Sequence, residues 1–291
     1  MKKQQKQTKN YFEKFASEWQ ARSSKKKIEL YNTVQQRNNY VLNYIKKNKP
    51  KNFLDIGCGS GELVITSSSY TKQSLGIDFS KSMIDLCNKK ITKKNNVKFI
   101  CNSFFNVNFK KNSFDLISAN GFIEYISLEQ LDMFLNICRK LLRSNGRLIL
   151  SSRNRLFNLF SLNNFSRSEI LNNTRLKFLF EESINLAQQD FKSFIKLKRK
   201  LPFTKLIKQE KTSINVNVRY QFTPLQLIDL LKKFKFQTLD LYPINYHPII
   251  PSNFNSKNKE IRKISNNLLK NFPKINMIPN SSAFMIAAKC K

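Results

Sequence analysis

The chain alternates short apolar runs with longer segments in which apolar residues recur at helical spacing. The runs cover residues 53–56, 75–78, 98–102, 114–119 and 147–151, followed late in the chain by 236–241 and 282–289. Runs of this length suit strands of a sheet that is buried on both faces. Between them, capping sequences at Ser127 and at Thr223 with Pro224 begin two predicted helices. The pattern predicts an α/β fold with seven strands.

Three glycines stand at alternate positions directly after the first apolar run. Gly57, Gly59 and Gly61 let the backbone turn sharply and approach a ligand more closely than any Cβ would allow. Their spacing differs from the G-x-G-x-x-G of hydride-transferring Rossmann proteins. Asp55 lies in the run itself, and Asp78 closes the next run, where its carboxylate can accept hydrogen bonds from both hydroxyls of a ribose. The loop therefore predicts a site for a nucleotide-type cofactor.

Three segments together resemble the class I S-adenosylmethionine-dependent methyltransferases, namely Leu54-Asp-Ile-Gly-Cys-Gly-Ser-Gly, Leu75-Gly-Ile-Asp-Phe-Ser and Phe114-Asp-Leu-Ile-Ser. A glycine-rich turn without a ligand is the alternative. The resemblance implies a Rossmann-like sheet with the strand order 3-2-1-4-5-7-6 and S-adenosyl-L-methionine as the cofactor. It also implies cofactor contacts from Asp55, Gly57, Gly59, Gly61, Asp78, Phe79, Asn102 and Asn120.

Two segments flank the predicted sheet core. Helices within residues 10–48 precede the first strand, an arrangement similar to the quinone O-methyltransferases, in which an arginine binds the carboxylate of the cofactor's methionine tail. Arg37 stands at that position, although an ordinary surface arginine is the equal alternative. Residues from about 153 to 220 form an insertion that we expect to cap the acceptor, and nearby segments resemble methyltransferases of surface-polysaccharide gene clusters.

The domain organisation follows from these boundaries. We expect a disordered basic tail over residues 1–9 and a single methyltransferase domain over residues 10–291, which contains the N-terminal helices and the helical cap insertion.

Candidate residues for the chemistry are few. A hydroxyl acceptor benefits from a general base with a pKa near neutrality, and His247 is the only histidine of the chain. It lies on a proline-flanked loop after the sixth strand, where a purely structural histidine is the alternative. Glu124, just past the fourth strand, is the second candidate for the catalytic base. With one histidine and scattered cysteines, no dedicated metal site is expected.

The charge balance broadens the range of partners. Lys plus Arg number 52 and Asp plus Glu 19, which gives a formal net charge of +33. A general attraction to phosphate-bearing partners and a biased codon usage are competing explanations. The alternation of Phe or Leu with Lys or Arg in the cap could also face an anionic membrane. The five cysteines lack C-x-x-C pairing, and no apolar run is long enough to span a membrane. We expect a cytoplasmic protein, with peripheral contact at the inner membrane face as an addition.

The favoured function is transfer of a methyl group to a hydroxyl of a small-molecule, glycan, lipid-linked or quinone-type acceptor. The alternative is an RNA methyltransferase that uses the basic surface. Against it, the fourth strand ends in Ser118-Ala-Asn-Gly-Phe and lacks the Asn/Asp-Pro-Pro-Tyr/Phe with which base-amino methyltransferases hold a flipped base. A specific nucleic acid partner is therefore not expected. A third interpretation is a degenerate fold that only binds, which the intact Asp55, Asp78 and glycines argue against.

Overall fold

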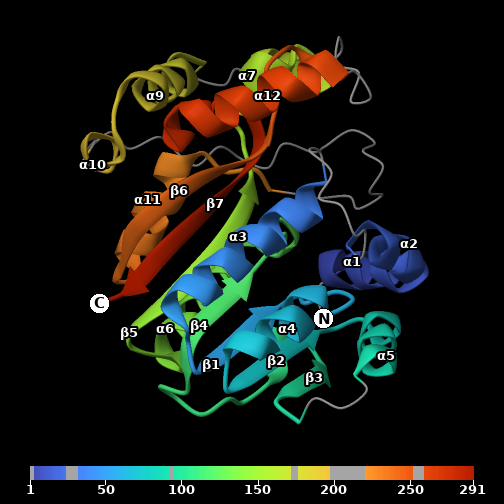
Figure 1. Cartoon of the computed structure of the whole chain (residues 1–291). Coiled ribbons are helices and arrows are strands. Elements are labelled where there is room, and N and C mark those ends of the chain that lie inside the picture. Colours follow the sequence, from blue (N-terminus) through green and yellow to red (C-terminus); the bar gives the residue numbers. More distant parts are fainter. Residues whose placement is uncertain (1–2, 24–31, 92–94, 172–175, 197–219, 252–258) are drawn as a thin grey trace.

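A seven-stranded sheet forms the centre of the molecule (Figure 1). The computed structural model describes residues 3–23, 32–91, 95–171, 176–196, 220–251 and 259–291. The strand order is β3-β2-β1-β4-β5-β7-β6, which confirms the predicted order. Pairs among the first five strands are parallel, whereas β7 is antiparallel to both β5 and β6. The strands are β1 (Asn52–Ile56), β2 (Gln73–Asp78), β3 (Val97–Cys101), β4 (Phe114–Ala119), β5 (Leu142–Arg153), β6 (Phe236–Tyr246) and β7 (Ser281–Cys290).

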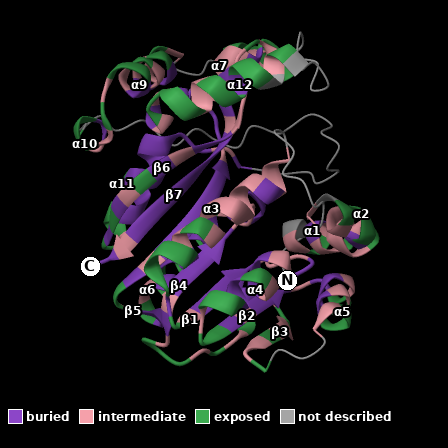
Figure 2. Cartoon of the chain, in the orientation of Figure 1, coloured by how far each residue is buried: buried purple, intermediate pink, exposed green. Residues whose placement is uncertain are grey.

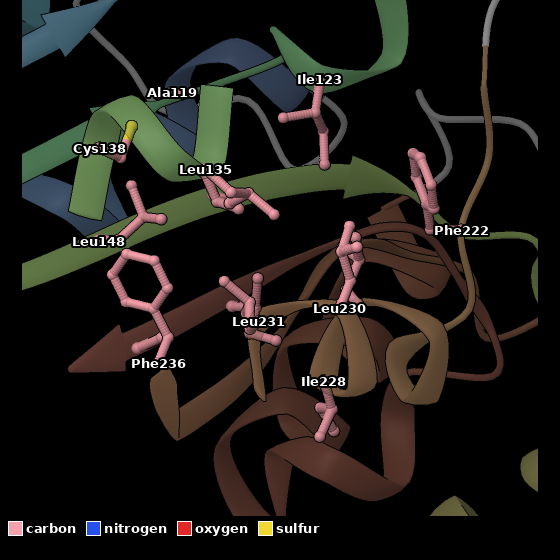
Figure 3. Packing of buried hydrophobic residues seen from close by; sticks show 14 of the residues in the cluster. Ala119, Ile123, Leu135, Cys138, Leu148, Phe222, Ile228, Leu230, Leu231 and Phe236 are labelled. Carbon is pink, nitrogen blue, oxygen red and sulfur yellow. The ribbon is translucent and has the colours of Figure 1, made fainter. Parts of the chain in front are cut away.

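Helices cover both faces of this sheet, and the strands are its most buried part (Figure 2). On one face Val41 and Ile45 pack against the sheet. On the other face Leu135 and Leu231, from two further helices, lie in one cluster with Leu148 of β5 (Figure 3). The helices are α1 (Lys3–Lys14), α2 (Ala16–Ser23), α3 (Thr33–Asn48), α4 (Glu62–Ser67), α5 (Lys81–Lys90), α6 (Leu128–Leu141), α7 (Phe157–Ser161), α8 (Asn164–Leu171), α9 (Leu176–Gln188), α10 (Phe191–Phe194), α11 (Pro224–Lys233) and α12 (Lys259–Asn271).

The N-terminal residues depart from the sequence-based expectation. Residues 3–9, expected to belong to a disordered tail, form the first turns of α1. Thr8 is buried, and the ring of Phe12 packs edge-on against Tyr125 at a centroid distance of 5.5 Å. The carboxylate of Glu13 accepts hydrogen bonds from the backbone N–H groups of Lys81 and Ser82 at the start of α5. These contacts dock α1 on the sheet domain, so the basic composition of the tail does not keep it unfolded.

The fifth strand is longer than predicted. Its pairing with β4 begins at Phe114 and Leu142, then shifts so that Leu116 faces Arg147. The extra residues form a bulge in which Asn145 adopts a positive φ of 63°, a conformation that asparagine tolerates better than most residues. Asn145 and Gly146 therefore bend the strand within β5.

Beyond β5, the described part of the cap insertion is helical and comprises α7, α8, α9 and α10. The rest of the insertion, residues 197–219, lies outside the described residues. Helix α12, between β6 and β7, was not anticipated from the sequence. Together with α7 and α9 it occupies the end of the molecule beyond the carboxyl ends of β4 and β5 (Figure 1). No helix in the described ranges is long and apolar enough to cross a membrane.

Candidate functional site

A cavity of about 810 Å³ lies at the carboxyl ends of the parallel strands, where ligands of open α/β sheets bind. Its walls come from the loops after β1, β2 and β4, from helices α1 to α3, and from the cap. Nearly every residue predicted from the sequence to contact cofactor or acceptor lines this one cavity, and Gly61 is the exception. Those that line it are Arg37, Asp55, Gly57, Gly59, Asp78, Phe79, Asn102, Asn120, Glu124 and His247.

The glycine loop presents backbone to the cavity. The N–H of Gly57 donates to the carbonyl of Ile77 at 2.8 Å, which ties the loop to β2. Gly59 has a positive φ of 53°, and nothing lies within 4 Å of the place where a Cβ would stand. Since the space beside Gly59 is open, a ligand can come directly against the loop there.

Gly61 has a different task from the one predicted. It lies outside the cavity lining and forms the N-cap of α4, with a φ of 80°. A Cβ at this position would meet the ring of Phe99 at 2.7 Å and the sulfur of Cys87 at 2.8 Å. Gly61 therefore shapes the loop by allowing close packing underneath it, and its contact with the cofactor stays a prediction.

Two buried carboxylates stand behind the loop. Asp78 accepts hydrogen bonds from the N–H of Gly59 at 3.0 Å and from the N–H of Ser80 at 2.9 Å, so its side chain is fixed at the end of β2. The hydroxyl of Ser118 donates to Asp55. Burial raises the pKa of Asp78 to about 6 and that of Asp55 to about 7. Burial has removed water from Asp78. A ligand that donates hydrogen bonds to its carboxylate in place of that water would favour the ionised form of Asp78.

Further along the cavity, the side chain of Asn120 donates to Asn38 at 3.3 Å. Its carbonyl oxygen is buried and accepts no hydrogen bond in the described structure. Buried acceptors in folded proteins are nearly always paired, so this oxygen is aimed at a donor that a ligand can bring. Asn102, at the end of β3, is exposed in the cavity and accepts a hydrogen bond from the N–H of Ser103.

Arg37 and Glu124 meet across the cavity wall. Nη2 of Arg37 lies 3.5 Å from Oε1 of Glu124, and the two side chains are 11% and 1% exposed. A guanidinium beside a buried carboxylate favours its ionised form and orients both groups. The pairing suits Glu124 as the residue that positions Arg37. It makes the alternative role as a base less apt, because proton uptake would leave Arg37 without its counter-charge.

His247 follows the end of β6 and is buried at the opposite part of the cavity. Its ring packs against Phe157 of α7 with centroids 5.0 Å apart. The amide of Asn245 lies 3.4 Å from Nε2 and donates to the hydroxyl of Ser282 at 2.6 Å. Burial lowers the pKa of His247 to about 4, so the imidazole is neutral at physiological pH. A neutral imidazole can accept a proton, but a pKa of about 4 makes this one a weaker base than the near-neutral histidine expected from the sequence.

Several cavity residues carry no sequence signal that would have singled them out. Asn245 and Ser282 come from adjacent strands and meet only because β6 and β7 are paired. Arg153, the last residue of β5, is one of 52 basic residues, and Thr8 belongs to the expected tail. Within the described residues, no group of three or more His, Cys, Asp or Glu side chains could hold a metal ion.

Known proteins resemble this chain in the same region. Residues 54–150 match the family described as "Methyltransferase domain". A phosphoethanolamine N-methyltransferase of Plasmodium falciparum is 29% identical over 112 residues, 38% of this chain and 42% of that protein. A ubiquinone biosynthesis O-methyltransferase of Coxiella burnetii is 27% identical over 146 residues, 49% of this chain and 59% of that protein. The matches thus span less than two thirds of either relative.

Solved structures extend the likeness to the whole fold. The magnesium protoporphyrin IX methyltransferase of Synechocystis PCC 6803, crystallised with bound S-adenosylhomocysteine, superposes with a TM-score of 0.57. The match covers 97% of each chain at 12% sequence identity, a level that supports the fold alone. Strand order, glycine loop and matched family agree. The fold is that of the class I S-adenosylmethionine-dependent methyltransferases, and residues 54–150 match a methyltransferase family.

Proposed function

We propose that the protein binds S-adenosyl-L-methionine and catalyses methyl transfer to a hydroxyl group of a small-molecule, glycan, lipid-linked or quinone-type acceptor. One observation carries the proposal. A single cavity joins the glycine loop and Asp78 to a buried, neutral His247. Cofactor residues and a proton acceptor therefore share one cavity, as a transfer reaction requires.

The residues present fit the cofactor. Asp78 offers a fixed carboxylate to ribose hydroxyls, and the open backbone at Gly59 leaves room for close approach. The buried carbonyl oxygen of Asn120 can accept from an ammonium or amino group. Arg37 would bind the carboxylate of the methionine tail, for which a guanidinium fork is well matched. When bound, S-adenosylmethionine supplies a sulfonium methyl group that is already electrophilic.

The task of the protein is then to position the acceptor and to remove its proton. His247 would take the hydroxyl proton on a ring nitrogen as the oxygen becomes the nucleophile. The amide of Asn245, which lies 3.4 Å from Nε2, helps to orient the imidazole ring. The ring of Phe157 packs against the imidazole and covers one of its sides.

The choice of a hydroxyl over an amine rests on His247. The relatives named above include both an O- and an N-methyltransferase. A neutral amine is nucleophilic without a base, whereas a hydroxyl gains from one, so a buried neutral histidine supports the hydroxyl. Residues of α1, α2 and the cap contribute to the walls, which suits a small acceptor better than a nucleic acid polymer. Five free thiols and the positive charge support a cytoplasmic enzyme that also contacts an anionic membrane face.

The acceptor can be found by comparing a deletion strain with its parent. Untargeted mass spectrometry of metabolites and glycans should show a species lighter by one methyl group in the deletion strain. The wild-type gene should restore the missing methyl group, and Asp78→Ala should not. If the only missing product is one methylated nucleoside of RNA, the small-acceptor proposal is wrong and the RNA methyltransferase takes its place.

A further inference from the structure

The charges that line the cavity are divided between its two ends. Its carboxylates within the described residues are those of Asp55, Glu62, Asp78 and Glu124, all at or just after β1, β2 and β4. The opposite end is formed by the carboxyl end of β5, the cap and the segment after β6, and Arg153 is the cationic residue that lines it. This second end faces the proposed acceptor, since His247 belongs to it.

Arg153 is held firmly in place. As the last residue of β5 it is paired with Ala283 of β7, and its carbonyl accepts a hydrogen bond from the N–H of Phe222 at 3.2 Å. Its guanidinium lies over the ring of Phe165, with its central carbon 5.6 Å from the ring centroid. Stacking uses the flat face of a guanidinium, whereas its N–H donors lie in its plane and point sideways.

Helix α8, which supplies the ring of Phe165, is itself held in place by buried hydrogen bonds. Glu169 of α8 accepts hydrogen bonds from Arg155 at 3.0 and 2.7 Å and from the amide of Asn158 at 2.8 Å. Both oxygens of this buried carboxylate are therefore engaged by Arg155 and Asn158. The neighbouring arginine Arg155 is thus neutralised within the fold by Glu169.

The other described residues that line this end are uncharged or, in the case of His247, neutral. Amide side chains come from Asn158, Asn163 and Gln221, and aromatic rings from Phe157 and Phe165. A guanidinium offers donors to an anion, and the rings offer an apolar surface to the body of the same molecule.

We propose that the acceptor is an anionic molecule whose phosphate or carboxylate binds Arg153, while its body packs on Phe157 and its hydroxyl lies beside His247. This inference rests on the proposed function, because it names the class of acceptor for the same cavity. The anion can belong to a soluble ester or to a lipid-linked one, and both share the chemistry that a guanidinium recognises.

The test uses binding, so it does not depend on knowing the natural acceptor. Calorimetry with the full chain saturated with S-adenosylhomocysteine should detect phenyl phosphate, and more weakly benzoate. Phenol, which lacks the anion, should bind worse than either. Arg153→Gln should weaken phenyl phosphate about ten- to a hundredfold and leave phenol unchanged, since a charge-assisted hydrogen-bond pair is lost. Arg167→Gln is the matched control, because Arg167 is exposed on α8.

The outcomes separate this inference from the proposed function. Equal binding of phenyl phosphate by wild type and Arg153→Gln, or no binding of any anion, would overturn the anionic acceptor even if S-adenosylhomocysteine still binds. A loss of S-adenosylhomocysteine affinity in Arg153→Gln as large as the loss of phenyl phosphate would assign Arg153 to the cofactor, and would also overturn it. A further titration with dioctanoyl phosphatidic acid shows whether the anion belongs to a lipid or to a soluble ester. Tighter binding of the lipid supports a lipid-linked acceptor, and tighter binding of phenyl phosphate supports a soluble one.

Discussion

At the scale of single residues, the cavity depends on polar groups that burial has forced into unusual protonation states. Asp55 and Asp78 have raised pKa values and His247 has a lowered one, in each case chiefly because burial disfavours the charged form. Each group therefore couples the stability of the fold to pH, and each change of protonation would alter what the cavity can bind.

His247 gives the first prediction. Its pKa of about 4 in the folded protein lies below the usual 6.5, so the unfolded chain binds more protons between these two values. The stability that neutral His247 contributes is present above about pH 6.5 and is lost as the pH falls towards 4, by roughly 3 kcal/mol at most. Relative to His247→Gln, the wild type should lose unfolding free energy over this interval in urea titrations. Parallel stability curves for the two proteins would show that His247 titrates normally.

Arg37 gives the second prediction. If it binds the methionine carboxylate, Arg37→Ala should weaken S-adenosylhomocysteine about ten- to a hundredfold and adenosine hardly at all, because adenosine has no carboxylate. Calorimetry with both ligands distinguishes the cases. Arg143→Ala is the control, since its partner Asp115 lies at the surface, away from the cavity. The same loss for both ligands would limit Arg37 to packing and to its pairing with Glu124.

At the scale of elements, the helices that precede β1 contribute more residues to the cavity than the sequence predicted. Helix α1 contributes Gln5, Thr8 and Phe12 to the cavity, although its first residues read as a polar tail. Its docking depends on Glu13, whose carboxylate accepts from two backbone N–H groups and from the hydroxyl of Ser82 at the N-terminus of α5. A carboxylate at a helix N-terminus also complements the helix dipole.

The third prediction concerns the loss of the Glu13 carboxylate, which holds α1 against the start of α5. Glu13→Ala should speed hydrogen exchange of the α1 amides about tenfold and weaken S-adenosylhomocysteine, while the exchange of the strands stays unchanged. Glu18→Ala on α2 is exposed and provides the comparison. Unaltered exchange in α1 would mean that its aromatic contacts alone hold it.

The sequence predicted those parts of the fold whose signals are local. The glycine loop and the carboxylate of Asp78 follow from short runs with a known spacing. The strand order was implied by the family resemblance of these runs, and the structure confirms it. Helix α12 was missed even though Ile261, Ile264, Leu268 and Leu269 stand at helical spacing, so this part of the sequence carried a signal that was not used. The contact between Arg153 and Phe165, and the group formed by Asn245, His247 and Ser282, arise only when distant segments meet. No local pattern encodes them.

At the scale of the whole molecule, the net charge of +33 separates the two enzymatic interpretations. If the charge acts only by general attraction, RNA binding should be weak, should fall about tenfold or more from about 50 to about 200 mM salt, and should not depend on RNA sequence or structure. Fluorescence anisotropy with a single strand and a hairpin of equal length measures this. Tight binding of one RNA that survives the higher salt would favour the RNA methyltransferase.

The central claim is that this fold holds S-adenosylmethionine between the glycine loop and Asp78, and isothermal titration calorimetry with S-adenosylhomocysteine tests it most directly. Wild type should bind, Asp78→Asn should keep part of the affinity because one oxygen can still accept, and Asp78→Ala should lose about 1 to 3 kcal/mol of binding free energy. Thermal melts would confirm that all three proteins are folded. No binding by folded wild type, or equal affinity in Asp78→Ala, would contradict the account.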